Sequence, residues 1–91
     1  AHYNRGVLRA QLGDNNRAIE DFNFVLQAEP DNTLARYNRA LLLEETGDYR
    51  KAISDYTILL VEYPNFLYGY QTRARLRRLI GDTKGAKDDE T

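Results

Sequence analysis

The sequence repeats itself at a spacing of 34 residues, and this spacing limits the folds that the chain can adopt. Identical residues return at this spacing at Tyr3 and Tyr37, Asn4 and Asn38, Arg5 and Arg39, Gly13, Gly47 and Gly81, Ala18, Ala52 and Ala86, and Pro30 and Pro64. A period of this length is typical of proteins that stack copies of one small unit. We therefore expect one domain with repeats at 1–32 and 33–66 and a partial third repeat at 67–91.

Each repeat divides into two helical halves. In the second half of the first repeat, the apolar residues Ala18, Ile19, Phe22, Val25 and Leu26 fall on one face of a helix, and the same offsets return 34 residues later. The pattern predicts helices near 1–12, 15–28, 33–46, 49–62 and 67–80, with a short sixth helix near 83–90. Short connections make neighbouring helices antiparallel.

Glycine, aspartate and proline recur where these helices should end or begin. Gly13, Gly47 and Gly81 each follow a first helix, where a left-handed residue is least costly as glycine. The residue after each glycine is predicted to cap the next helix, at Asp14, Asp48 and Asp82. Residues after the prolines are predicted to cap as well, at Asp31, Asn32 and Asn65. Pro30 and Pro64 end the second helices.

Composition argues against several classes of function. The chain has no cysteine and one histidine, His2, and it has no glycine-rich phosphate loop, so we expect no catalysis, cofactor or metal. A net charge of -1 and the absence of a long apolar run predict neither nucleic acid nor membrane as a partner. The basic residues Arg73, Arg75, Arg77 and Arg78 form either a solvated surface or a local patch that attracts anions. The chain contains no methionine and opens in helical sequence, so we expect a fragment of a longer protein, of unspecified compartment.

The period and its landmarks resemble the tetratricopeptide repeat family. Small residues stand where the two helices of a repeat cross, at Gly6, Ala40 and Ala74, and aromatic residues follow the alanine of the second helix, at Phe22 and Tyr56. The resemblance implies an all-α, right-handed superhelical solenoid of antiparallel helix pairs, about two and a half repeats long. Departures occur at His2 and Arg36, where the family has an aromatic residue.

The resemblance also implies a non-catalytic scaffold that binds a peptide or partner protein on its concave face. The first helices line that face, which assigns binding to Tyr3, Asn4, Val7, Tyr37, Asn38, Leu41, Gln71, Thr72 and Arg75. An asparagine amide can both donate to and accept from a peptide backbone. Tyr3 and Tyr37 either contact the ligand or pack between adjacent first helices.

Three arginines occupy positions where the family has leucine. Arg5, Arg39 and Arg73 are each followed 16 residues later by an aspartate, Asp21, Asp55 and Asp89. Sixteen residues lead up one helix, round the turn and back beside the starting point. We therefore predict the ion pairs Arg5–Asp21, Arg39–Asp55 and Arg73–Asp89 between the helices of each repeat.

Three rival functions follow from other features. A variant of the family grips the carboxylate tails of chaperones, but only Asn38 fits its residues at Tyr3, Val7, Asn38, Tyr68 and Thr72, so we do not expect this ligand. Weak homo-oligomerisation through an uncapped end at Leu76, Leu79 and Ile80 is the main alternative. RNA binding, as in related pentatricopeptide arrays, is disfavoured by the spacing, the prolines and the net acidity of residues 1–66.

Overall fold

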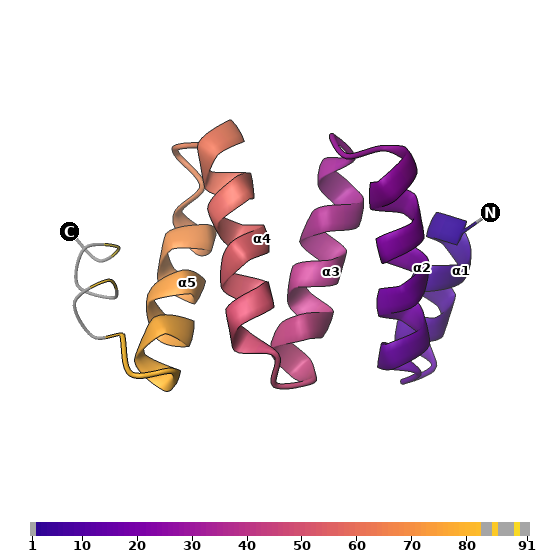
Figure 1. Cartoon of the computed structure of the whole chain (residues 1–91), viewed down its shortest axis with the longest axis horizontal. Helices are drawn as coiled ribbons and strands as arrows, with labels where there is room; N and C mark the ends of the chain where they lie inside the picture. The colour runs from indigo at the N-terminus through magenta and orange to yellow at the C-terminus, as the bar shows by residue number, and fades with distance from the viewer. Residues whose placement is uncertain (1, 83–84, 86–88, 90–91) are drawn as a thin grey trace.

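The computed structural model describes residues 2–82, Gly85 and Asp89, and within this part the secondary structure is entirely helical. The helices are α1 (His2–Gln11), α2 (Asn15–Ala28), α3 (Thr33–Glu45), α4 (Tyr49–Glu62) and α5 (Leu67–Leu79). They follow one another along the long axis of the molecule, each antiparallel to the next (Figure 1). The chain thus forms an all-α right-handed solenoid, and the expected sixth helix lies mostly outside the described residues.

The glycine turns adopt the conformation that their position predicts. Gly13, Gly47 and Gly81 have φ of 83°, 85° and 87°, in the left-handed region. At the first turn the amide of Gly13 donates to the carbonyl of Ala10, and the amide of Asp14 donates to the carbonyl of Arg9. The same two bonds close the turns at Gly47 and Gly81. These bonds satisfy the last carbonyls of each first helix and reverse the chain.

The helix starts differ from one another more than the sequence suggests. Asn32 caps α3 as predicted, because its side chain accepts from the amide of Ala35 at 3.1 Å. The prediction is wrong for Asp14 and Asp48, which stand at the N-cap positions without a side-chain cap. Their ψ angles of 69° and 68° fall short of the extended region that usually accompanies such a cap. Their carboxylates lie instead beside Arg17 and Lys51.

The remaining caps to compare are those at Asp82 and at the start of α5. Asp82 accepts from the amide of Gly85 at 3.0 Å, as expected of a cap. The N-cap residue of α5 is Phe66 and not Asn65, and Phe66 supplies no side-chain cap. The ends of the helices are therefore fixed more by the glycine turns and by packing than by side-chain caps.

The core forms two layers, one between α2 and α3 and one that joins α3, α4 and α5. In the first layer Phe22, Val25 and Leu26 of α2 pack against Ala35 and Leu42 of α3. In the second layer Tyr56 and Leu59 of α4 pack against Leu76 of α5, together with Ala40, Leu43 and Ala52. The middle helix α3 therefore buries one face against α2 and another face against α4. This arrangement makes the stack continuous.

The helices of each pair cross at the small residues. Gly6 is buried, and a Cβ atom there would lie 3.1 Å from Cζ of Phe22. Ala40 and Ala74, at the same repeat position, are buried as well. A larger side chain at this position would separate the two helices.

The prediction of an uncapped apolar end at Leu76, Leu79 and Ile80 is wrong for Leu76. Leu76 is not exposed at that end, because its side chain faces α4 and is 0% exposed. Leu42, at the same repeat position, faces α2 and is 6% exposed, whereas Leu8 of α1 is 53% exposed. The unpartnered copy of this leucine thus lies on α1, at the opposite end of the molecule.

No helix in the described residues is both long enough and apolar enough to cross a lipid bilayer.

Candidate functional site

A groove runs along the first helices of the stack and consists of two adjoining hollows. One, of about 280 Å³, lies between α1 and α3 and is lined by Val7, Ala10, Gln11, Phe22, Asn38, Leu41, Leu42 and Glu45. The other, of about 340 Å³, lies between α3 and α5 and is lined by Leu41, Glu44, Glu45, Tyr49, Tyr68, Arg75 and Leu79. Leu41 and Glu45 border both hollows, so the two form one surface, which we call the groove.

Four of the nine predicted binding residues line this groove: Val7, Asn38, Leu41 and Arg75. The amide nitrogen of Asn38 donates to the hydroxyl of Tyr3 at 3.1 Å. The ring of Tyr3 packs edge-on against Phe22, with 5.7 Å between centroids. Tyr3 therefore ties α1 to α3 and fixes the orientation of Asn38, as its packing alternative predicted.

The other predicted residues lie elsewhere. Asn4 and Gln71 are exposed and Thr72 is buried. Tyr37 packs edge-on against Phe66 and Tyr68, with 5.9 Å and 6.4 Å between ring centroids. Burial raises the pKa of the Tyr37 hydroxyl, so this group stays protonated at neutral pH.

The groove contains two neighbouring carboxylates that sequence analysis missed. Glu44 accepts from Arg75 and, at 3.5 Å, from the hydroxyl of Tyr56. Burial raises the pKa of the Tyr56 hydroxyl far above its ordinary value, so it remains a donor. Glu45 accepts from the side chain of Asn15 at 3.1 Å. Their spacing could have revealed them, because residues three and four positions after Leu41 share its side of a helix.

Of the two alternatives for the arginines of α5, a solvated surface or a local patch that attracts anions, the ion pairs of these residues do not favour the patch. Arg75 pairs with Glu44 across the groove. Arg73 and Arg77 both pair with Asp89, and Arg77 also lies 3.7 Å from Asp82. Arg73, Arg75 and Arg77 are thus held by carboxylates of the chain itself, which reduces their attraction for an external anion.

The structure brings together all three arginine–aspartate pairs. Nη2 of Arg5 lies 2.6 Å from Oδ1 of Asp21, and Nη2 of Arg39 lies 2.7 Å from Oδ1 of Asp55. Arg73 donates through Nε to Oδ2 of Asp89 at 2.8 Å. Hydrogen bonding from the Arg5 guanidinium lowers the pKa of Asp21, although burial acts in the opposite direction.

Each aspartate also has a second arginine nearby. Arg9 lies 3.0 Å from Asp21, Arg77 lies 2.9 Å from Asp89, and Arg36 lies 3.8 Å from Asp55. Arg39 additionally donates to Asn23 of the preceding helix pair, as Arg73 does to Thr57. The arginines therefore connect successive pairs as well as the two helices of one pair.

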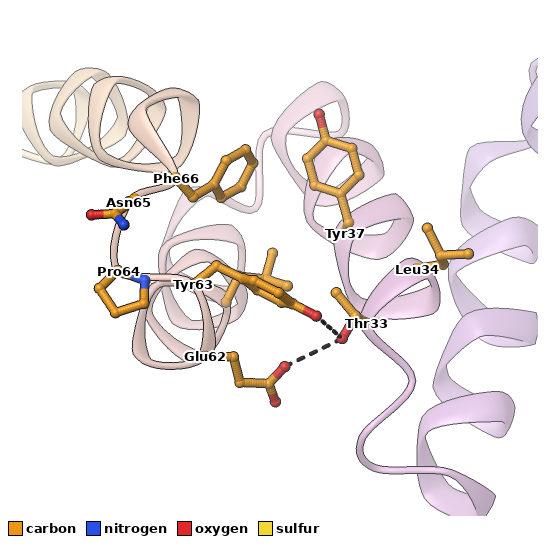
Figure 2. Close-up of a pocket in the computed structure, with 9 residues that line it drawn as sticks. Thr33, Leu34, Tyr37, Glu62, Tyr63, Pro64, Asn65 and Phe66 are labelled. Carbon is orange, nitrogen blue, oxygen red and sulfur yellow. Dashed lines mark hydrogen bonds between the residues drawn. The ribbon is translucent and has the colours of Figure 1, made fainter.

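A further hollow, of about 640 Å³, lies where α3 begins and α4 ends, and we call it the α3–α4 pocket (Figure 2). It is lined by Thr33, Leu34, Tyr37, Leu59, Glu62, Tyr63, Pro64, Asn65 and Phe66. Of these, Tyr37 alone is a binding residue predicted from the sequence. The pocket is built from the start of α3, the end of α4 and the turn from α4 to α5, so no local sequence pattern predicts it.

A stack of antiparallel helix pairs with a groove along its first helices defines a helical repeat solenoid. Residues 3–65 match the family model of the tetratricopeptide repeat. The chain belongs to the tetratricopeptide repeat family.

Solved structures support this assignment. The second TPR of Spaghetti (RPAP3), bound to the HSP90 peptide SRMEEVD, is 26% identical with a TM-score of 0.83, over 98% of this chain and 82% of that one. MamA from Desulfovibrio magneticus RS-1 is 22% identical with a TM-score of 0.88, over 97% of this chain and 50% of that one. The Sgt2 TPR domain from Aspergillus fumigatus is 24% identical with a TM-score of 0.79, over 97% of this chain and 58% of that one. No curated protein matches the chain.

Proposed function

We propose that this chain is a non-catalytic protein-interaction scaffold that binds an extended segment of a partner protein in the groove. The observation that carries the proposal is the continuity of the groove across α1, α3 and α5 at Leu41 and Glu45. A surface of this form suits a peptide that lies across several helices and inserts alternate side chains. The similar Spaghetti domain, which was solved with a peptide, gives independent support.

The proposed contacts come mainly from the middle of the groove. Val7 and Leu41 offer apolar surface, while Asn38, Glu45 and Arg75 offer polar groups at its sides. Asn4 and Gln71 are exposed and are proposed as outer contacts, whereas Tyr3, Tyr37 and Thr72 are proposed to shape the groove from behind.

The acidic tail held by the Spaghetti domain is not the ligand that we propose here. Glu44 and Glu45 lie within this groove, and its cation Arg75 is already paired with Glu44. Asn38, the one residue that fits the carboxylate-binding variant of the family, donates its amide to Tyr3. A peptide with apolar side chains and few acidic ones fits this charge distribution better.

The test is a selection of short peptides from a displayed random library, followed by affinity measurements on variants. Leu41→Glu places a charge in the middle of the groove and should weaken selected peptides about tenfold or more. Val61→Glu adds the same charge at a residue of α4 that is exposed and does not line the groove, and it should leave binding unchanged. Equal affinity of the wild type and Leu41→Glu, with intact helical circular dichroism, would remove the groove from the mechanism.

Self-association is a second candidate, supported by the exposed end at α1. Leu8 and Phe24 are exposed there, although the copies of Leu8 at Leu42 and Leu76 are buried. A second molecule could cover this apolar surface. Sedimentation over a range of concentrations should show an association that Leu8→Ser abolishes, and a monomer at all concentrations would discard this function.

A further inference from the structure

The α3–α4 pocket has walls that suit a long side chain with an apolar stem. The rings of Tyr37, Tyr63 and Phe66 surround it, and Leu34 lies opposite Phe66 (Figure 2). The rings of Tyr37 and Phe66 meet edge-on, so their faces point in different directions. Aromatic faces carry negative electrostatic potential and attract cations placed over them.

The pocket also has a negative charge, on the exposed residue Glu62. Glu62 is the only charged residue among those that line it. One oxygen of its carboxylate accepts from the hydroxyl of Thr33 at 3.2 Å, and that hydroxyl lies 3.5 Å from the hydroxyl of Tyr63 (Figure 2). These contacts hold the carboxylate beside the aromatic rings without neutralising it.

The two helix ends at the pocket do not alter the sign of this charge. Glu62 is the last residue of α4, where the helix dipole favours a cation, whereas Thr33 is the first residue of α3, where it favours an anion. One free amide of α3 is already satisfied by the side chain of Asn32. The opposing dipoles offset one another, so Glu62 and the rings determine what the pocket attracts.

We propose that the α3–α4 pocket binds a lysine or arginine side chain from a partner protein. The methylene groups of such a side chain would pack against Leu34 and the aromatic rings, and its charged end would lie beside Glu62. A neutral apolar side chain would fit between the same walls but would leave Glu62 without a cation. An acidic side chain would meet repulsion from Glu62. The assignment is separate from the groove and does not require that the groove be used.

The proposal can be tested by nuclear magnetic resonance on the whole chain with two small probes. Nα-acetyl-lysine methylamide carries the cation, and Nα-acetyl-norleucine methylamide has a similar apolar stem without it. We expect the lysine probe to shift the amide signals of Thr33, Tyr63 and Asn65 and to bind about fivefold more tightly than the norleucine probe. Equal or tighter binding of norleucine would overturn the proposal, and so would shifts confined to other residues.

Two matched variants locate the source of the preference. Glu62→Gln should abolish the advantage of lysine over norleucine, while Glu45→Gln, which neutralises an exposed carboxylate of the groove, should preserve it. A lysine preference that survives Glu62→Gln would contradict the assignment. Leu41→Glu, which tests the groove, should not change the binding of either probe, so failure of one proposal can be distinguished from failure of the other.

Discussion

The contacts between the helices of a pair and the groove between successive first helices use charge in different ways. Within the pairs, the same arginine and aspartate return at the same positions, and the aspartates Asp21 and Asp55 are each only 2% exposed. In the groove, the position of Val7 becomes Leu41 in α3 and Arg75 in α5. Residues that hold the helices together therefore recur with the period, whereas residues that line the groove can differ from one repeat to the next.

The groups of arginines around Asp21, Asp55 and Asp89 also differ from one another in one detail. Arg9 and Arg77 supply the second cation in α1 and α5, but the corresponding residue of α3 is Leu43, which packs in the core. Arg36 approaches Asp55 from another position, at 3.8 Å. The second pair thus gains apolar burial where the others gain a direct ion pair, and its Asp55 depends more on Arg39.

The largest loss of stability should come from removing Asp55, the aspartate of the second helix pair. Asp55→Ala leaves the guanidinium groups of Arg39 and Arg36, which are 22% and 11% exposed, without their counter-ion. We expect a loss of about 3 kcal/mol in the free energy of unfolding, measured with urea. Lys51→Ala breaks an exposed pair with Asp48 and should cost less than about 0.5 kcal/mol. Similar losses in both variants would erase the distinction between buried and exposed charge.

The next effect is a dependence of stability on pH, which arises from Asp21. The pKa of Asp21 is lowered in the folded chain, mainly by hydrogen bonding from Arg5. Its stabilising contribution is therefore complete above the unfolded pKa of about 4 and is lost as the pH falls through the lower folded value. Thermal melts below pH 4 should show a steep loss of stability that is shallower in Asp21→Asn. Parallel acid profiles for the two proteins would show that this aspartate is not involved.

A smaller loss of stability should follow when the hydrogen bond between Asn38 and Tyr3 is removed. Tyr3→Phe removes the hydroxyl that accepts from Asn38 and should lower stability by about 1 kcal/mol in urea unfolding. Tyr68→Phe serves as the control, because this tyrosine is exposed and should tolerate the change. If Tyr3→Phe were as stable as the wild type, the hydrogen bond between α1 and α3 would contribute nothing, and Tyr3 would act only through its ring contact with Phe22 of α2.

The features that sequence could predict are those that the period imposes. The left-handed glycines and the three ion pairs follow from spacing, because contacts between repeated helices must recur with the repeat. The caps predicted at Asp14 and Asp48 are absent, because each carboxylate lies beside the cation three residues later in its helix, Arg17 or Lys51, and not on a helix amide.

Other features depend on how elements meet in space. The burial of Leu76 depends on which face of α5 meets α4, and the α3–α4 pocket depends on how the turn from α4 to α5 lies against the start of α3. Of the candidate groove, Val7, Asn38, Leu41 and Arg75 could be assigned from family positions, whereas Glu44 and Glu45 stand outside those positions and could be found only from their spacing after Leu41.

The smallest effect on stability should come from the charge that crosses the groove. Arg75 is 56% exposed although it pairs with Glu44, so Arg75→Ala should change the free energy of unfolding by less than about 0.5 kcal/mol. The same variant exposes the carboxylate of Glu44 to the groove, so peptides with a basic residue should bind more tightly and acidic ones more weakly. Urea unfolding and fluorescence anisotropy with two peptides that differ only in this charge would measure both effects. A loss of stability as large as that of Asp55→Ala would mean that Arg75 belongs to the stacking residues, because a charge held for recognition can be removed without unfolding the helices around it.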